Sequence, residues 1–95
     1  MTRSELVYRI AERLDFHSEK EKQSVELAFS AIIAQISDKL ATRGTVEIRG
    51  FGTFFCSLRA PQAARNPKTG TILHLSERHL PRFRPAQTLR DRIDR

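Results

Sequence analysis

Apolar residues in the first 44 positions recur at the spacing of two amphipathic helices. In the first segment they are spaced three and four apart: Leu6, Val7, Ile10, Ala11 and Leu14. This spacing predicts a short helix over about residues 3–14. Thr2 and Glu5 stand just ahead of it in the pattern of a capping box, in which each side chain bonds the other's backbone amide.

A longer apolar stripe follows a second capping box at Ser18 and Glu21. It holds helical spacing for more than four turns: Val25, Ala28, Phe29, Ile32, Ile33, Ile36 and Leu40. Gly44 comes just past the stripe and suits a helix stop. Residues 1–44 are therefore predicted to form an antiparallel helix pair with a tight joint near residues 15–17.

The pattern changes to period two after Gly44. Residues 45–49 alternate as a half-buried strand does, residues 50–52 read as a Gly-Phe-Gly turn, and residues 53–58 form an apolar second strand. Leu80 and Phe83 indicate that residues 79–84 return to this sheet, and Pro85 suits the start of a short C-terminal helix over residues 85–95.

Residues 59–78, here called the arm, have too few apolar side chains to form a core. Two extended segments, about 58–64 and 71–78, are expected to be joined by a turn at residues 65–70, here called the tip. The predicted fold is α+β: a helix pair, a three-stranded antiparallel sheet with a protruding two-stranded arm, and a short C-terminal helix. One domain spans residues 1–95.

Charge is distributed unevenly over this framework. The net charge is +6. Residues 1–44 hold seven Lys/Arg and seven Asp/Glu, whereas residues 45–95 hold ten and four, so the whole excess lies in the second half. Such a skew favours an anionic partner: nucleic acid first, then an anionic membrane surface.

Several function classes lack support in the sequence. No apolar run is long enough to span a membrane, and no signal-peptide pattern opens the chain. Cys56 is alone, and His17, His74 and His79 lack metal-site spacing. No catalytic constellation is recognisable. The chain is expected to be no enzyme, to use no cofactor, metal, small-molecule substrate or membrane, and to be cytoplasmic.

The apolar arc of the second helix predicts a dimer. Only about 70 residues remain outside the arm, a size at which a single core becomes marginal. Leu27 and Ala31 widen the arc beyond what one short helix and a small sheet could cover. An obligate, intertwined dimer is expected, with a loose monomer as the alternative. Its predicted core comprises Phe29, Ile32, Ile33, Ile36, Leu40, Phe51 and Phe54.

The arm and its approaches carry six cations against the single acid Glu77: Arg59, Arg65, Lys68, Arg78, Arg82 and Arg84. Such a ribbon suits the phosphate backbone. Pro67 at the tip is a rigid apolar wedge that could unstack a base step, and Arg65 and Asn66 could meet minor-groove acceptors. The alternative is that residues 66–70 form an ordinary turn with no binding role.

The wider pattern resembles the bacterial histone-like HU and integration host factor family over nearly the whole length. The resemblance rests on three segments: Gly50-Phe51-Gly52-Thr53-Phe54, Arg65-Asn66-Pro67-Lys68-Thr69-Gly70 and Phe83-Arg84-Pro85. The start of the chain, and segments such as Glu47-Ile48-Arg49-Gly50, look most like the integration host factor beta subunit. The wedge-and-bend mechanism is a known property of that family and comes with the resemblance.

The resemblance implies a dimer, of one chain or with a related subunit, whose two arms embrace duplex DNA in the nucleoid. Pro67 would intercalate, with Arg65, Asn66 and Lys68 around it in the minor groove. Arg49 would confer sequence preference with Glu47 holding it, although that pair could equally be structural. Phosphate contacts would come from residues beside the arm and at the first helix start: Arg3, Ser4, Arg82 and Arg84.

Four positions depart from the family pattern. Ala64 and Ala86 stand where glycine is usual, and Gln62 and Gln87 stand where a cation is expected. Binding without sequence preference, as in HU, therefore stays open beside the host-factor interpretation. Two further hypotheses are an RNA or single-strand binder that stacks bases on Phe51, Phe54 and Phe55, and a protein-interaction dimer whose charge is incidental.

Overall fold

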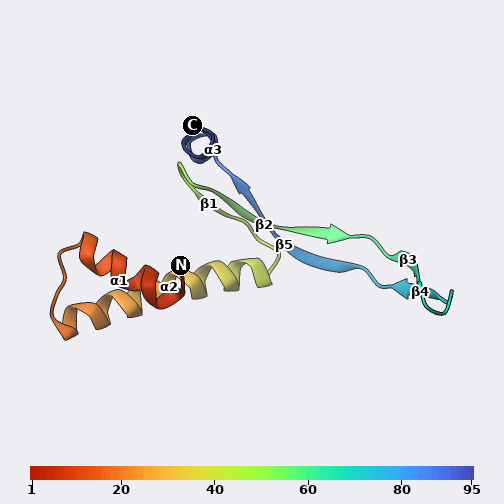
Figure 1. Ribbon diagram of the computed structural model, residues 1–95, viewed down its shortest axis with the longest axis horizontal. Helices are drawn as coiled ribbons and strands as arrows, with labels where there is room; N and C mark the ends of the chain where they lie inside the picture. Colours follow the sequence, from red (N-terminus) through yellow and green to blue (C-terminus); the bar gives the residue numbers. More distant parts are fainter. The chain divides into compact units, whose positions relative to one another are not determined.

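A computed structural model describes residues 1–95, apart from the side chains of Gln62, Ala64 and Leu75. Its elements follow in chain order (Figure 1): α1 Arg3–Arg13, α2 Glu19–Ala41, β1 Val46–Ile48, β2 Gly52–Arg59, β3 Gln62–Arg65, β4 Ile72–Leu75, β5 Arg78–Pro85 and α3 Gln87–Ile93. The chain divides into a helical unit, Met1–Asp38, and a sheet unit, Lys39–Arg95. The predicted α+β class is confirmed.

The helical unit pairs α1 with the first part of α2, as predicted (Figure 1). Three residues form its buried core: Val7, Ala11 and Val25. Ile10, Phe16 and Phe29 pack against them but remain partly exposed. Within α2, Val25 is the only residue of the apolar stripe that is fully buried in the single chain.

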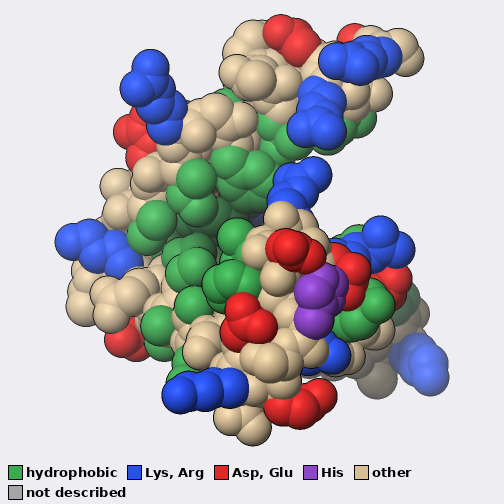
Figure 2. Space-filling view, turned by 90° about the vertical axis from the view of Figure 1, so that its left-hand side faces the viewer, with side chains coloured by type: hydrophobic (Ala, Val, Ile, Leu, Met, Phe, Trp, Pro, Cys, Tyr) green, Lys and Arg blue, Asp and Glu red, His purple; other side chains and the backbone are tan. Residues whose placement is uncertain are grey.

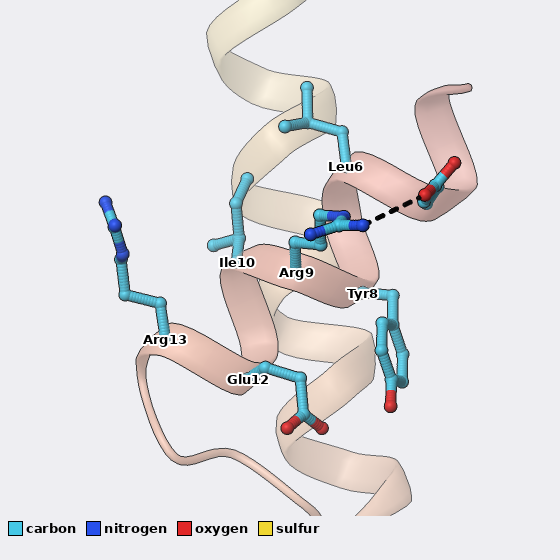
Figure 3. Close-up of a pocket in the computed structure, with 7 residues that line it drawn as sticks. Leu6, Tyr8, Arg9, Ile10, Glu12 and Arg13 are labelled. Atoms are coloured by element: carbon cyan, nitrogen blue, oxygen red, sulfur yellow. Dashed lines mark hydrogen bonds and ion pairs between the residues drawn. The ribbon is translucent and has the colours of Figure 1, made fainter. Parts of the chain in front are cut away.

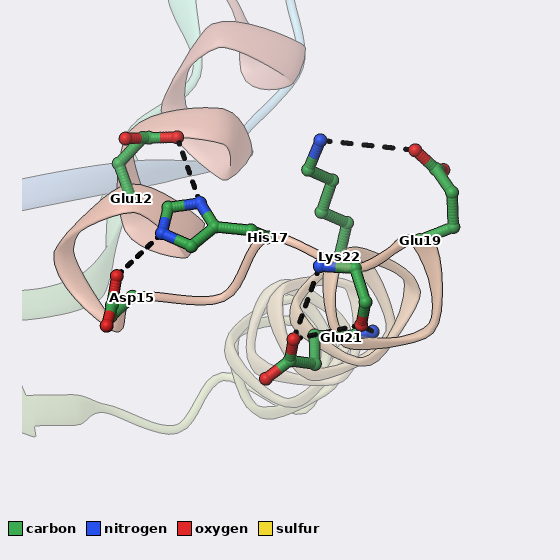
Figure 4. A network of polar contacts seen from close by, with 7 residues as sticks. Glu12, Asp15, His17, Glu19, Glu21 and Lys22 are labelled. Carbon is green, nitrogen blue, oxygen red and sulfur yellow. Dashed lines mark hydrogen bonds and ion pairs between the residues drawn. The ribbon is translucent and has the colours of Figure 1, made fainter.

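The two helix starts differ in how completely their capping boxes form. Thr2 Oγ1 accepts from the Glu5 amide at 3.3 Å, but the Glu5 carboxylate accepts from Arg9 instead of reaching back, so the first predicted box is half formed. At α2 the box is complete: Ser18 Oγ accepts from the Glu21 amide at 3.1 Å, and Glu21 accepts from the Ser18 amide at 3.2 Å (Figure 4).

The joint between α1 and α2 is a left-handed helix stop. Asp15 has φ +59°, and the Phe16 amide donates to the Ala11 carbonyl at 2.9 Å, which is the bond pattern of a Schellman motif. Phe16 then packs on the core. The His17 ring lies between two carboxylates, 2.6 Å from Asp15 and 3.8 Å from Glu12 (Figure 4).

The end of α2 repeats this device with one difference from the prediction. Gly44 donates its amide to the Lys39 carbonyl at 2.9 Å, so it closes the helix as expected. The residue in the left-handed conformation, however, is Arg43, at φ +65°. Gly44 is thus the second residue beyond the cap and not the turning residue itself.

The sheet of the second unit has the order β1-β2-β5, all antiparallel, with β2 in the centre. Gly52 pairs with Ile48 on one side and with Pro85 on the other. Beside it, the rings of Phe51, Phe54 and Phe83 form a cluster with centroid separations of 4.8 to 6.5 Å. These rings pack on one another, although Phe51 and Phe83 remain exposed in the single chain.

The arm is a separate two-stranded sheet, β3 with β4, beyond the far end of β2 and β5 (Figure 1). The last pair of the large sheet is Arg59–Arg78, and the first pair of the arm is Gln62–Leu75. Two residues therefore interrupt the ladder on each strand, residues 60–61 and 76–77, and the register continues unchanged across the interruption.

The prediction that Pro85 starts the C-terminal helix is wrong. Pro85 is the last residue of β5 and pairs with Gly52. The Ala86 amide then donates to the Phe51 carbonyl at 2.8 Å, so the chain stays bonded to the sheet before α3 begins at Gln87. Proline suits a helix start, but it is also tolerated on an edge strand such as β5.

Candidate nucleic-acid interface

The tip is an ordered turn that presents Pro67 to solvent. The Asn66 amide donates to the Thr71 carbonyl, and the Gly70 amide to the Asn66 carbonyl, both at 2.8 Å. The Asn66 side-chain oxygen accepts from the Lys68 amide at 2.9 Å, which closes the turn around Pro67. Gly70 supplies the left-handed conformation, at φ +72°. The turn is therefore ordered and leaves Pro67 exposed, a geometry that is compatible both with a wedge and with an ordinary turn.

The turn also determines which Asn66 atoms are free. Its Oδ1 is occupied by Lys68, and within the described residues its Nδ2 donates to no partner. An amide that presents only donors fits the minor groove of A·T pairs, where adenine N3 and thymine O2 are acceptors. Arg65, next to it and exposed, offers further donors of the same kind.

Cations line the sheet beside the arm. Arg78, Arg82 and Arg84 alternate along β5, which places them on one face, and all are exposed. Two of them are held by neighbours: Arg82 Nε donates to Ser57 Oγ at 3.1 Å, and the Arg84 guanidinium lies 5.0 Å from the Phe55 ring centre. Such contacts order the side chains while leaving N–H groups for phosphate.

Arg59 differs from the other predicted phosphate contacts. Its side chain is half-buried, and Nη2 donates to the Ser76 carbonyl at 2.9 Å. Its Nε is buried and has no partner among the described residues. The sequence predicts Arg59 as one more exposed cation, because nothing in its local pattern indicates a bond to a residue 17 positions away.

Glu47 and Arg49 lie near each other, but no ion pair of 4.0 Å or less joins them in the described part of the chain. Arg49 stands in the turn after β1, one residue beyond the strand predicted to include it. Both residues line a hollow of about 250 Å³ together with Arg84 and Pro85. The hollow brings an acid and two arginines together beside the sheet edge.

Arg3 and Ser4, predicted to contact phosphate, are both at the exposed start of α1. Arg3 is engaged within the helical unit: Nη2 donates to Glu26 at 2.9 Å and to Ser30 at 2.6 Å, and the guanidinium lies 4.9 Å from the Phe29 ring centre. These contacts tie α1 to α2, a role that the sequence pattern did not indicate.

The residues predicted to form a dimer core are not buried within the single chain. Ile32 is 56% exposed, Ile33 42% and Phe51 43%, while Phe29, Phe54, Ile36 and Leu40 are half-buried. Figure 2 shows a broad patch of hydrophobic side chains on the face turned to the reader. An apolar groove of about 170 Å³ lies between α1 and α2, lined by residues that include Leu14, Ala28 and Ile32.

A second, wider hollow of about 690 Å³ runs along α1 itself (Figure 3). Its lining mixes Leu6 and Ile10 with charged side chains, and Arg9 pairs with Glu5 at 3.3 Å. The hollow holds neither a cluster of metal ligands nor a nucleophile with its base. It resembles the rim of a protein–protein interface more than a substrate site.

Among the residues that the structure describes, no three His, Cys, Asp or Glu side chains gather as a metal site would require. Cys56 contacts the Leu40 carbonyl at 3.2 Å and is partly buried. None of the helices described has the length and hydropathy of a membrane span.

Two of the four positions that depart from the family pattern lie at the start of α3. Ala86 caps this helix without a side-chain hydrogen bond, and Gln87 Nε2 donates to Asp91 at 2.7 Å. The side chains of the other two, Gln62 and Ala64, are outside the described part.

The chain is similar to known proteins over its whole length. The family described as bacterial DNA-binding protein matches residues 1–94. Integration host factor subunit beta of Shewanella pealeana is 45% identical over 99% of this chain and 96% of its own, and that of Teredinibacter turnerae is 46% identical over 99% and 93%. A cocrystal structure of Anabaena HU with DNA covers 98% of this chain and 97% of its own at a TM-score of 0.86 and 25% identity. HU from Thermotoga maritima, at 24% identity and a TM-score of 0.65, shares the fold.

Proposed function

Because the chain belongs to the bacterial DNA-binding protein family that includes HU and integration host factor, we propose that it binds the minor groove of duplex DNA as a dimer and bends the duplex at Pro67. This is an architectural activity and not an enzymatic one. We expect this bending activity to serve nucleoid organisation, transcription and recombination.

The tip is the observation that carries the proposal. Three hydrogen bonds close the turn so that Pro67, which has no N–H to satisfy, is exposed between donor-bearing neighbours. An apolar wedge can open a base step at a cost of a few kcal/mol, and wider wrapping of the bent duplex offsets that cost. The Asn66 Nδ2, which donates to no partner within the described residues, supports contact with minor-groove acceptors at the same step.

The exposed cations supply the second part of the argument. Arg65, Lys68, Arg78, Arg82 and Arg84 lie in the sheet unit on or beside the arm. A dimer presents each of them twice, and each neutralised phosphate lowers the logarithm of the binding constant by about 0.9 per decade of salt. We expect steep salt dependence, which a protein-interaction dimer with incidental charge would not show.

The dimer is supported by what the single chain leaves uncovered. Three buried apolar residues are too few to hold a helical unit of this size, and Leu27 is 71% exposed in the middle of α2. A second copy, or a related subunit, would cover this stripe, so that folding and association occur together. Sedimentation equilibrium that found a folded monomer at micromolar concentration would contradict the dimer.

Similarity to the beta subunits favours site preference, with Arg49 and Glu47 at the sheet edge as its candidates. The alternative is binding without sequence preference. It is supported by the lack of a Glu47–Arg49 ion pair in the described residues, because Glu47 then does not hold the Arg49 side chain in one position. Selection from a random duplex pool separates the two, since only the first enriches a motif rather than flexible steps.

The wedge is tested by fluorescence energy transfer across an end-labelled duplex. Pro67→Ala should lose much of the bend while keeping its salt dependence, because the phosphate contacts are unchanged. Pro81→Ala is the matched control, as Pro81 is an exposed proline on edge strand β5 away from the tip. An unchanged bend in Pro67→Ala would refute intercalation by Pro67. In a competition measurement at fixed salt, preferential binding of RNA would overturn the proposal that the partner is duplex DNA.

A further inference from the structure

The root of the arm is where the backbone ladder stops. Ala60 and Pro61 on one strand, and Ser76 and Glu77 on the other, belong to neither sheet. A two-stranded ribbon loses stiffness where its hydrogen bonds stop, because adjacent dihedral angles are then unconstrained. What holds the two strands at this gap decides how firmly the tip is aimed.

Pro61 accounts for part of the gap. The bond from the Ala86 amide to the Phe51 carbonyl sets the alternation of bonded and non-bonded pairs along β2 and β5. Continued in the same register beyond Arg59–Arg78, that alternation makes Pro61–Ser76 the next bonded pair. Proline has no N–H, so the Ser76 carbonyl receives no backbone donor from Pro61.

The Arg59 side chain supplies the missing donor. Its Nη2 donates to the Ser76 carbonyl at 2.9 Å, from two residues before Pro61 on the same strand. The guanidinium is drawn inward so far that Nε is buried without a partner in the described residues. A buried unpaired N–H destabilises a fold, so the inward position of the Arg59 guanidinium needs a compensating gain. The hydrogen bond from Nη2 to the Ser76 carbonyl across the gap supplies it.

The cross-strand neighbour makes a natural comparison. Arg78 pairs directly with Arg59 on the ladder, carries the same charge, and is exposed. No hydrogen bond or ion pair within the described chain engages its guanidinium. The two arginines at one rung therefore differ in burial and bonding although they carry the same charge.

We infer that Arg59 is a positioning residue, which holds the arm to the sheet through the Ser76 carbonyl instead of contacting phosphate. Its effect on DNA rests on the proposed function, but its effect on the arm does not. Arg59 aims the tip, and Arg78 supplies the phosphate contact at this rung. Loss of either weakens DNA binding, for reasons that two measurements separate.

The first measurement is amide hydrogen exchange of β3 and β4 in the free protein. Arg59→Met should speed exchange there by about tenfold, the loss expected for one hydrogen bond with a charged donor. Arg78→Met should leave it unchanged. Arg59→Met with Pro61→Ala should recover slow exchange, because alanine restores a backbone N–H opposite Ser76. A uniform speed-up by both single variants, or no rescue, would overturn the inference.

The second measurement is the salt dependence of duplex binding. Arg78→Met should reduce the slope by about 0.9 per arm, whereas Arg59→Met should lower affinity at every salt concentration with the slope unchanged. A reduced slope together with normal arm exchange in Arg59→Met would make Arg59 a phosphate contact and refute its positioning role. If no form of the protein binds DNA but Arg59→Met still speeds amide exchange in the arm, the positioning role of Arg59 stands and the proposed function fails.

Should Arg59→Met not fold, nitrogen-15 spectra of the wild-type guanidinium groups give the same test. The Arg59 Nε–H should exchange slowly with water and the Arg78 Nε–H quickly, since only the first is buried. Equal, fast exchange of the two groups would contradict the inference without any substitution.

Discussion

Gly52 is the position at which a single methyl group should do the most damage to the sheet unit. It is buried in the central strand and pairs with both neighbours, Ile48 and Pro85. A Cβ built there would lie 2.5 Å from the tip of the Phe83 ring and 2.6 Å from the Arg84 carbonyl oxygen. Gly52→Ala therefore forces movement in two elements at once.

The size of the effect follows from which of these atoms can move. The Phe83 ring is confined by Phe51 and Phe54, whose centroids are 5.2 and 4.8 Å away, and the Arg84 carbonyl belongs to the β2–β5 ladder. Overpacking of this kind costs about 1–3 kcal/mol, and the backbone clash places this case at the upper end. For a chain of this size, that corresponds to a fall in Tm of roughly 10–20 °C.

The assay is thermal unfolding at fixed protein concentration, since the stability of a dimer depends on concentration. Gly50→Ala is the matched control, because Gly50 has φ +78° but nothing within 4 Å of a built Cβ. It should cost only the left-handed strain, about 1–2 kcal/mol. A Gly52→Ala protein that melts within 2 °C of wild type, or above Gly50→Ala, would refute the packing argument.

Two further predictions concern the helical unit. The hydrogen bonds from the Ser18 hydroxyl and amide lower the pKa of the Glu21 carboxyl, so the ionised carboxylate stabilises the folded state fully above the ordinary carboxyl pKa and loses this effect as pH falls through the lowered pKa. Glu21→Gln should therefore flatten the acid limb of a plot of the urea unfolding midpoint against pH. An unchanged acid limb would contradict this. Val25→Ala, at a side chain only 4% exposed, should cost about 2 kcal/mol in urea unfolding, whereas exposed Gln23→Ala should cost almost nothing; equal costs would dispute the core assignment.

The sequence predicted most elements because their residues carry local patterns. The stripe from Val25 to Leu40 repeats often enough to define α2, and Asn66 to Gly70 have the residue types that a tight turn requires. Pro85 was misplaced because proline is compatible with two environments. The pairing with Gly52, 33 positions earlier, decides between them, and no local pattern reports it.

The sequence predicts which residues of the candidate site are cationic, but not which of them bond within the fold and which remain exposed. Arg3 and Arg59 look like the exposed arginines in sequence, yet one ties α1 to α2 and the other bonds the Ser76 carbonyl. These partners are 23 and 17 positions away, so only the fold brings them together. One feature could have indicated the second case: Pro61, two positions after Arg59, removes a backbone donor from a predicted ribbon.

The interruption at the arm root also limits how this ribbon can change in length. Two residues on each strand separate the pair Arg59–Arg78 from the pair Gln62–Leu75, so the arm keeps the register of the sheet. Inserting one residue in only one linker would set three residues against two at the root, and the extra residue would form a bulge that bends the arm relative to the sheet, while the tip turn keeps the pairs within the arm. One residue added to both linkers would keep the register but turn the side chains of the arm to the opposite face, so an exchange of the arm between relatives should cut both strands at the same rung and keep both linkers at two residues.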